Sequence, residues 1–335
     1  MTRVLVPLLT TAPARPLGGV VHPLAGQTMG TTWSVKLTAQ PAADLPALTA
    51  MVQRALDTVV AQMSPWEPLS SLSRYNRAPA GSWTRLPADL ATVLRRAIAV
   101  AQATDGAFDP TLGALTDLWG FGPRPFAGAP PSAEAITAAR DAGGWKRLTL
   151  DGDALFQPDE LRLDLNGIAK GFGVDQAAAA LERAGVKSWL VEVGGELRGT
   201  GARPDGQPWW VELERAPDMA LVANDSLQTV VALHDLAVAT SGDYRRFFDH
   251  DGRRYAHTLD PATGAPSQGG VVSVTVLAAT AMDADAFATA LTVMGPQAAL
   301  AFATDHELAA LIVSRTAGGG LEERLSPALL AMLDP

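Results

Sequence analysis

The hydrophobic pattern of the 335-residue chain changes its period near the middle. In the first half, apolar residues recur every three or four positions, which favours helices with one buried face. After a strand at 31–38, helices are predicted from Asp44 to Met63 and at 89–102 and 132–142. In the second half, strand-like runs predominate, with helices predicted only after Gly173 and at 283–294. The runs lie at 161–165, 189–193, 209–214, 229–233, 271–277 and 308–314. Grouped strands of this kind favour an α+β fold, with largely antiparallel sheets flanked by helices.

Residues 1–27 are rich in Pro, Gly and Thr and are predicted to form a flexible lead-in. Residues 28–335 are expected to form one domain, with two closely packed subdomains divided near 125–160 as the alternative. Arg3, an apolar run and the small residues 12–14 are similar to a signal peptide, but the run is short and contains Pro7. A cytoplasmic protein is therefore expected, and periplasmic export is the alternative.

Composition excludes several kinds of site. The chain has no cysteine, so a disulfide framework, a thiolate metal site, a cysteine nucleophile and a lipoprotein anchor are not expected for the chain as given. Its net charge of −9 argues against nucleic acid as a partner, because binding the phosphate backbone needs a basic surface. No apolar stretch approaches the roughly 18 residues of a membrane span. Because the chain has no cysteine, any metal must be held by oxygen or imidazole ligands.

The segment 163–173 is the first that could carry chemistry. It is predicted to be a strand that enters glycine-flanked backbone and then a helix, so free N–H groups could bind phosphate near Lys170. It lacks the Walker spacing. Taken alone, the segment is more typical of an ordinary strand–turn–helix with a solvated lysine.

The segment 280–289 is the second. In a helix, Asp285 and Thr289 lie one turn apart on one face and offer the hard oxygen ligands that Mg²⁺ prefers. The alternative is structural, with Asp283 as the N-cap, Asp285 interacting with the helix dipole and Thr289 packed. Taken alone, the segment favours this structural interpretation.

The segments 239–246 and 255–264 contain Ser241 and His257. His257 is a candidate base near neutral pH, although a single histidine is more often structural. A hydrolase triad with Ser241 is disfavoured, because no G-x-S-x-G elbow surrounds the serine. Two polar and aromatic loops at 63–76 and 104–122, and a glycine-kinked strand at 193–197, complete the candidate site segments.

Together and in this order, these segments resemble the ApbE family of FAD:protein FMN transferases. The matching pieces lie at 29–33, 63–76, 106–122, 164–175, 191–197, 239–244, 257–264 and 281–289. Each piece is short, and it is their joint order and spacing over nearly the whole chain that makes the resemblance specific.

The resemblance implies an ApbE-like α+β fold and a Mg²⁺-dependent enzyme. The enzyme would cleave the pyrophosphate of FAD, place FMN on a Thr or Ser hydroxyl of an acceptor flavoprotein and release AMP. It implies acceptors that carry an Asp-x-Ser/Thr-Gly-Ala-Ser/Thr motif. The Mg²⁺ ligands would be the Asp285 carboxylate, the Thr289 hydroxyl and the main-chain carbonyl of Gly167.

The resemblance also implies the FAD contacts, which would be Met29, Trp66, Asn76, Asp109, Lys170, His257 and Leu259. Of these, His257 would help to deprotonate the acceptor hydroxyl, and Lys170 would offset charge on the pyrophosphate. Two alternatives stay open: a Mg²⁺-dependent FAD pyrophosphatase that gives FMN and AMP, and a non-catalytic FAD-binding protein.

Overall fold

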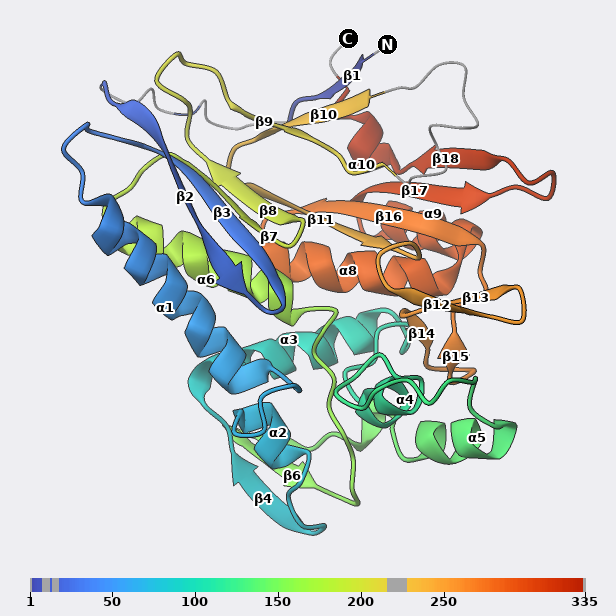
Figure 1. The fold of residues 1–335 in the computed structure, drawn as a ribbon. Helices are drawn as coiled ribbons and strands as arrows, with labels where there is room; N and C mark the ends of the chain where they lie inside the picture. The colour runs from blue at the N-terminus through green and yellow to red at the C-terminus, as the bar shows by residue number, and fades with distance from the viewer. Residues whose placement is uncertain (1, 8–12, 14–17, 216–227, 334–335) are drawn as a thin grey trace.

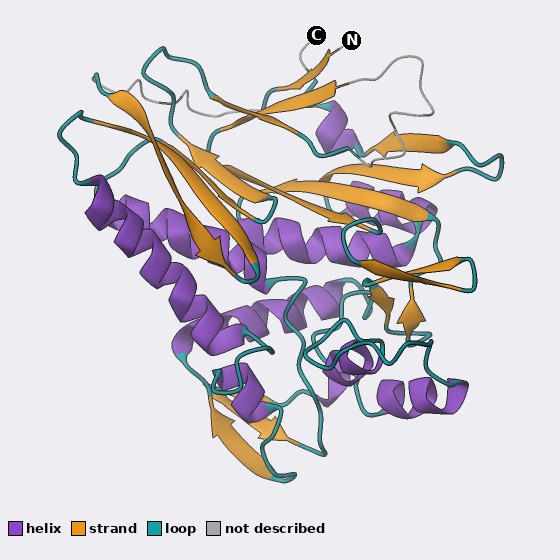
Figure 2. Ribbon diagram, in the orientation of Figure 1, coloured by secondary structure: helices purple, strands orange, loops and turns teal. Residues whose placement is uncertain are grey.

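The computed structural model describes residues 2–7, 13, 18–215 and 228–333, and its centre is one large sheet. The sheet has eight strands, and every neighbouring pair is antiparallel (Figure 2). In spatial order the strands are β18 (Leu321–Leu325), β17 (Ala309–Arg315), β16 (Val271–Ala278), β11 (Leu236–Gly242), β8 (Glu196–Thr200), β7 (Trp189–Val193), β3 (Thr31–Ala39) and β2 (Val20–Thr28).

Four helices cover one face of this sheet (Figure 1). They are α1 (Leu45–Met63), α6 (Ala169–Arg183), α8 (Ala281–Met294) and α9 (Pro296–Asp305). As predicted, Asp44 caps α1 by accepting a hydrogen bond from the Ala47 N–H at 3.0 Å. Helices α6 and α8 pack closely against each other and against the sheet. Their first turns both face the layer beyond the helices, where the candidate site lies.

The opposite face of the sheet is covered by a small sheet and a short helix near the chain termini (Figure 1). Leu5, Trp209 and Leu233 from these elements form a core cluster with Val238 and Leu311 of the large sheet. The elements are β1 (Thr2–Leu5), β9 (Trp209–Glu212), β10 (Gln228–Leu233) and α10 (Pro327–Leu330). Strand β1 pairs with β10 in parallel, which closes this end of the fold.

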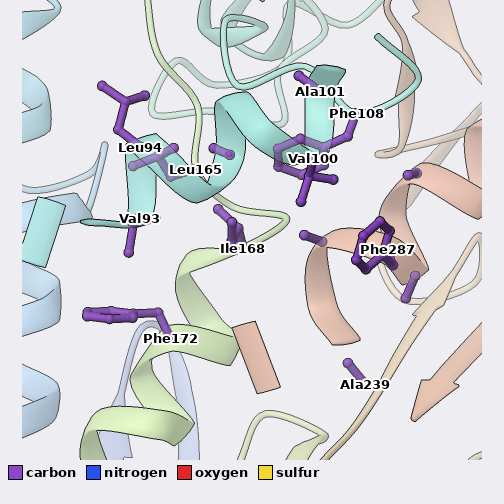
Figure 3. Packing of buried hydrophobic residues seen from close by; sticks show 14 of the residues in the cluster. Val93, Leu94, Val100, Ala101, Phe108, Leu165, Ile168, Phe172, Ala239 and Phe287 are labelled. Carbon is purple, nitrogen blue, oxygen red and sulfur yellow. The ribbon is translucent and has the colours of Figure 1, made fainter. Parts of the chain in front are cut away.

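A third layer lies beyond the helices, and its largest helix is α3 (Ala88–Ala103). Val93 and Val100 of α3 belong to the same buried cluster as Ile168, Phe172 and Phe287 (Figure 3). The other elements of this layer and its hairpins are α2 (Ser71–Tyr75), β4 (Ser82–Arg85), α4 (Gly113–Leu118), α5 (Ala133–Asp141), the 3-10 turn η1 (Trp145–Arg147), β5 (Leu150–Asp151), β6 (Ala154–Gln157), β12 (Phe247–His250), β13 (Arg253–Ala256), β14 (Leu259–Asp260) and β15 (Ala265–Pro266).

The predicted α+β class with largely antiparallel sheets is confirmed. The division into subdomains near 125–160 stays a prediction. In the part of the chain that the structure describes, no helix combines the length and apolar character needed to cross a bilayer.

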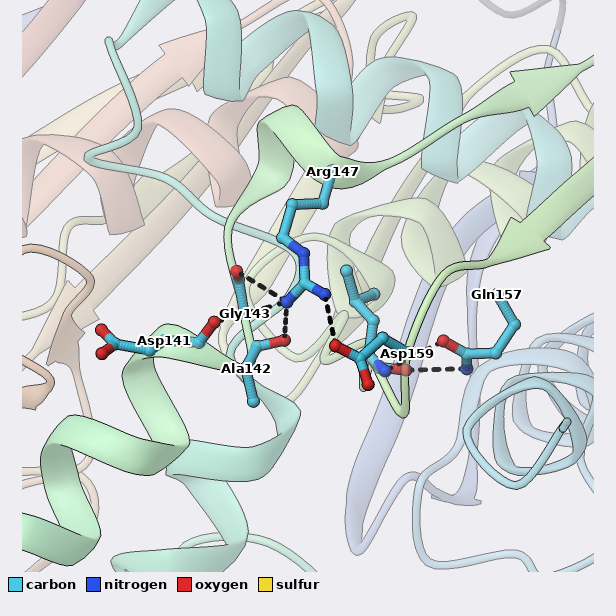
Figure 4. Close-up of polar contacts among 7 residues, drawn as sticks. Asp141, Ala142, Gly143, Arg147, Gln157 and Asp159 are labelled. Atoms are coloured by element: carbon cyan, nitrogen blue, oxygen red, sulfur yellow. Dashed lines mark hydrogen bonds and ion pairs between the residues drawn. The ribbon is translucent and has the colours of Figure 1, made fainter. Parts of the chain in front are cut away.

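The prediction of a strand at 161–165 is wrong. This segment is extended, but side chains satisfy much of its backbone instead of a neighbouring strand. Gln157 accepts from the Leu161 N–H at 2.9 Å and donates to the Leu161 carbonyl at 3.0 Å. Close by, Arg147 joins the carbonyl of Ala142 to the carboxylate of Asp159 (Figure 4). The apolar run is therefore buried without joining a sheet.

Three local predictions also differ from the structure. The predicted lead-in contains strand β1 and most of β2, which pairs with β3 along its full length. Within this lead-in, residues 12 and 14 of the segment that is similar to a signal-peptide cleavage site lie outside the described residues, so they are not compared. Helix α6 begins at Ala169 rather than after Gly173. The N-cap of α8 is Thr280, whose hydroxyl accepts from the Asp283 N–H at 3.1 Å, so Asp283 lies in the first turn.

Gly171 should be required for the contact between α6 and α8. A Cβ atom on Gly171 would lie 2.1 Å from the Ala281 carbonyl oxygen, which is backbone and cannot move without moving α8. We expect Gly171→Ala to lower the free energy of unfolding by about 1–3 kcal/mol, as overpacked cores do. Chemical denaturation would measure the change.

Gly173→Ala is the matched control, because the two glycines lie in the same helix and gain the same helix propensity. A Cβ atom on Gly173 would meet the movable end of the Met29 side chain at 2.8 Å. Equal stability of the two variants would contradict the proposed importance of the backbone contact.

Candidate active site

A cavity of about 740 Å³ opens where the first turns of α6 and α8 meet the third layer. The turn between β2 and β3, the end of α1 and the segments that follow β11 and β13 complete its wall. A cavity of this size is typical of small-molecule and cofactor sites. The wall thus combines segments that lie far apart in the sequence.

The wall contains all of the predicted site residues except Asn76. Those present are Met29, Trp66, Asp109, Gly167, Lys170, His257, Leu259, Asp285 and Thr289. The structure therefore brings the two predicted chemical segments, 163–173 and 280–289, into one hollow. The roles of the individual residues stay predictions.

Asn76 does not reach this cavity. Its amide donates to the Leu163 carbonyl at 2.9 Å and accepts from the Leu163 N–H at 2.8 Å. Both ends of the amide therefore act as a neighbouring strand would, and they hold the extended segment 161–165 in place. Asn76 thus supports the wall of the site and lines a second hollow beside the cavity, and its contact with FAD stays a prediction.

Asp109 lines the cavity, but its carboxylate is already engaged. It accepts from the Thr111 hydroxyl at 2.6 Å, the Thr111 N–H at 2.8 Å and the Trp145 N–H at 3.1 Å. Burial raises its pKa, although these hydrogen bonds oppose the rise. Asp109 therefore shapes the loop that forms this part of the wall.

Oxygen atoms gather where the backbone of Gly167 approaches α8. A Cβ atom at Gly167 would lie only 2.9 Å from the Thr289 hydroxyl oxygen, so no larger residue fits there without a shift. The hydroxyl of Ser241 lies 3.3 Å from that of Thr289. Asp285, one turn earlier in α8, accepts a hydrogen bond from the Gly171 N–H at 3.0 Å. The two hydroxyl groups, the carboxylate and the backbone of Gly167 therefore line one part of the cavity.

A partly exposed cation and two buried carboxylates lie beside this oxygen cluster. Lys170 forms an ion pair with Glu196, which is 1% exposed. Burial raises the pKa of Glu196 to about 7, against the effect of Lys170. Burial likewise raises the pKa of Asp285. Burial acts to lower the pKa of Lys170, but the two carboxylates outweigh it and the pKa is raised. Lys170 therefore stays a cation.

His257 is held in one orientation by Arg246. The Nδ1 atom lies 3.2 Å from the Arg246 carbonyl oxygen, which only accepts hydrogen bonds, so Nδ1 carries the proton. The Nε2 atom of the neutral ring is then an acceptor. Burial lowers the pKa of His257 to about 4, and the positive charges of Arg246, Lys170 and Arg245 act in the same direction. The imidazole is therefore neutral at pH 7.

Two arginines of the wall were not predicted as site residues. Arg245 donates to the Gly194 carbonyl at 2.8 Å and pairs with Glu214. Arg246 donates to the Phe121 carbonyl at 3.1 Å, and its guanidinium lies 5.8 Å from the centre of the Trp66 ring. They directly follow the motif 239–244, but the sequence gives no sign that both reach the cavity. Glu196 was missed in the same way within 193–197.

Among the residues that the structure describes, no group of three or more His, Cys, Asp or Glu side chains could hold a metal ion. The oxygen cluster offers one carboxylate together with hydroxyl and carbonyl groups. Such a set suits Mg²⁺, which keeps several waters and takes one or two carboxylates plus substrate phosphate. The residues present therefore fit a magnesium ion better than zinc or iron.

Comparison with known proteins identifies the family of the chain. The model of the ApbE family matches residues 29–312. A protein named FAD:protein FMN transferase from Vibrio cholerae is 40% identical over 301 residues, which are 89% of each chain. A protein of the same name from Haemophilus influenzae is 37% identical over 312 residues, which cover 88% of this chain and 87% of that one.

Solved structures show the same fold. The flavin transferase ApbE from Vibrio cholerae superposes with a TM-score of 0.87 at 38% identity, over 94% of this chain and 100% of that one. The apo form of the flavinyl transferase ApbE from Pseudomonas stutzeri gives a TM-score of 0.85 at 38% identity, over 95% and 98% of the two chains. The protein described here belongs to the ApbE family.

Proposed function

We propose that this protein transfers FMN from FAD to a hydroxyl group of an acceptor protein and releases AMP. The observation that carries the proposal is the meeting of two segments in one cavity. Gly167 and Lys170 at the start of α6 lie beside Asp285 and Thr289 of α8. The names of the relatives support the same reaction.

The reaction exchanges the phosphoanhydride bond of the pyrophosphate for a phosphoester bond to the acceptor. The acceptor oxygen attacks the phosphorus on the FMN side of the pyrophosphate and forms a new P–O bond. The bond between that phosphorus and the bridging oxygen breaks, and the electron pair leaves with AMP. The acceptor proton goes to a base. Positioning and electrostatic stabilisation are the main contributions that a protein makes to such a transfer.

The residues of the oxygen cluster suit a magnesium ion. Asp285, Thr289 and the carbonyl of Gly167 would hold it, with Ser241 close to Thr289. When bound, the ion would offset charge on the pyrophosphate oxygens. The Gly171 N–H holds one oxygen of the Asp285 carboxylate and so fixes the direction of the side chain.

His257 has the protonation state that a general base needs. With Nδ1–H donated to Arg246, Nε2 is free to accept a proton from the acceptor hydroxyl. A base placed within hydrogen-bond reach contributes about 10²–10⁴-fold to the rate of a proton-transfer step. The low pKa keeps the ring neutral over the physiological range.

Lys170, Arg245 and Arg246 give the wall three positive charges. Lys170 and Arg245 are each paired with a carboxylate, so the site is close to neutral before the substrate enters. We infer that these cations orient the pyrophosphate, and that Trp66 and Met29 contact the flavin or adenine ring. The acceptor hydroxyl belongs to a Thr or Ser in an Asp-x-Ser/Thr-Gly-Ala-Ser/Thr motif.

FMN transfer itself is tested by the mass of the acceptor. Purified protein incubated with FAD, Mg²⁺ and an acceptor domain carrying this motif should add one FMN group to the acceptor, a gain equal to the mass of FMN less one water. The control acceptor has its Thr or Ser replaced by Ala and should gain no mass. Free FMN and AMP formed at the same rate without an acceptor would instead indicate a pyrophosphatase. FAD left intact in all samples would indicate a non-catalytic binding protein.

Asp285→Asn should reduce the transfer rate by at least about 10²-fold, because it removes the charged ligand proposed for the metal while keeping the size of the side chain. The rate would be measured at saturating FAD over a series of Mg²⁺ concentrations. Asp283→Asn is the matched control on the same helix, since Asp283 pairs with Arg96 at 2.5 Å, outside the cavity wall. Similar rates for the two variants would refute the metal assignment.

The contribution of His257 should persist to acidic pH. Because the pKa in the folded protein is lowered to about 4, the ring loses its function as a base only as the pH falls toward 4. We expect the transfer rate of the wild type divided by that of His257→Asn to stay constant from pH 8 to about 5. Below that pH this ratio should fall toward one. The ratio cancels the titration of groups common to both proteins. A ratio that declines around pH 6.5 would show that the imidazole titrates as it does in water.

A further inference from the structure

A second hollow of about 300 Å³ adjoins the active-site cavity. The two share Pro65, Thr116, Asp164 and Asn166 in their walls. The Thr116 hydroxyl donates to the Asp164 carboxylate at 2.6 Å, and this pair lies at the boundary between the two spaces. Asp164 also accepts from the Asn166 N–H at 2.8 Å, so the boundary is fixed by hydrogen bonds.

Three arginines line the second hollow. They are Arg77, Arg124 and Arg162, and the carboxylates in the same wall are those of Asp117 and Asp164. Asp117 lies 3.2 Å from Arg162 and 3.9 Å from Arg124. Arg77 donates to the Pro68 carbonyl and has no carboxylate partner among the described residues. The hollow therefore has an excess of positive charge in a chain whose net charge is −9.

The second hollow is linked to His257 through Phe121 and Arg246. Gly122 is in its wall, and the preceding residue, Phe121, accepts a hydrogen bond from Arg246. Arg246 in turn holds Nδ1 of His257 through its carbonyl. The arginine-lined space is thus joined to the proposed base by two consecutive hydrogen-bonded contacts.

We propose that the second hollow binds an acidic side chain of the acceptor protein, close in sequence to the hydroxyl that receives FMN. The inference rests on the proposed transfer reaction and adds a specificity site to it. Arginine is well suited to this task, because its planar guanidinium group can hold a carboxylate by two parallel hydrogen bonds. A volume of about 300 Å³ is at the lower end for ligand sites, which suits one or two side chains better than a nucleotide.

Truncation of Arg77 and Arg124 tests the proposal. The Arg124 side chain is 69% exposed, so its removal opens no core cavity. With FAD saturating, the double variant Arg77→Ala/Arg124→Ala should raise the KM for the acceptor by about tenfold. With the acceptor saturating, the KM for FAD should stay within about twofold of wild type. Arg203→Ala is the matched control, because Arg203 pairs with Asp205 outside both hollows and should change neither KM.

A second arm identifies the group that binds. Each acidic residue of the acceptor segment is changed in turn to its amide, and one such change should raise the acceptor KM of the wild-type enzyme about as much as loss of the arginines. The same acceptor change should add little in the double variant, since the two partners act through one contact. Replacing Arg124 by Lys instead of Ala in this double variant should recover part of the affinity for the acceptor. Lysine restores the positive charge but lacks the planar guanidinium group.

The outcomes separate this inference from the proposed function. Wild-type enzyme that transfers FMN while the arginine variants keep their acceptor KM would overturn only the acidic-residue site. A raised KM for FAD with an unchanged KM for the acceptor would assign the hollow to the nucleotide and also overturn it. Wild-type enzyme that adds no FMN to any acceptor would overturn the transfer reaction, and this inference with it.

Discussion

The close approach of α6 to α8 is the constraint on which the rest of the site depends. Gly171 presents bare backbone to Ala281, so the two helices contact each other without intervening side chains. The Gly171 N–H then reaches Asp285, and Asp175 of α6 accepts from the N–H groups of Ala281 and Met282 at 3.1 and 3.0 Å. These bonds lock the start of one helix to the start of the other. The carboxylate and hydroxyl groups of α8 are thereby fixed against the backbone at Gly167.

The same approach explains the electrostatics of the site. Groups at the junction are removed from water, which raises the pKa of Glu196 and of Asp285. Lys170 and Arg245 compensate for their charge, so the site combines buried anions with partly exposed cations. Polar groups held in place before a substrate arrives need no reorganisation during the reaction, and this is the usual source of electrostatic catalysis. Phosphoryl transfer depends strongly on such an arrangement, because its catalysis consists mainly of positioning and of stabilising the charge on the phosphate oxygens.

The side of the cavity that holds His257 is built differently, from stacked aromatic rings. Phe248 of the β12–β13 hairpin stacks on Trp119 and on Tyr255, and the ring of Phe121 lies edge-on to the His257 imidazole at 6.4 Å between ring centres. Arg246 connects this aromatic group to Trp66 and to the histidine. A rigid apolar support keeps the imidazole partly out of water, which together with the nearby positive charges explains its low pKa.

The α+β class, the main helices, the family and most of the cavity wall could be predicted from the amino-acid sequence, because these follow from local periodicity and from short motifs. The conformation of 161–165 and its hydrogen bonds to Asn76 could not be predicted in this way. Their hydrogen bonds join positions 87 residues apart, and a local apolar run looks the same with or without a strand partner. Arg245, Arg246 and Glu196 became site residues for the same reason. The elements packed around a turn decide which of its faces borders a cavity. The local sequence pattern does not show which elements these are.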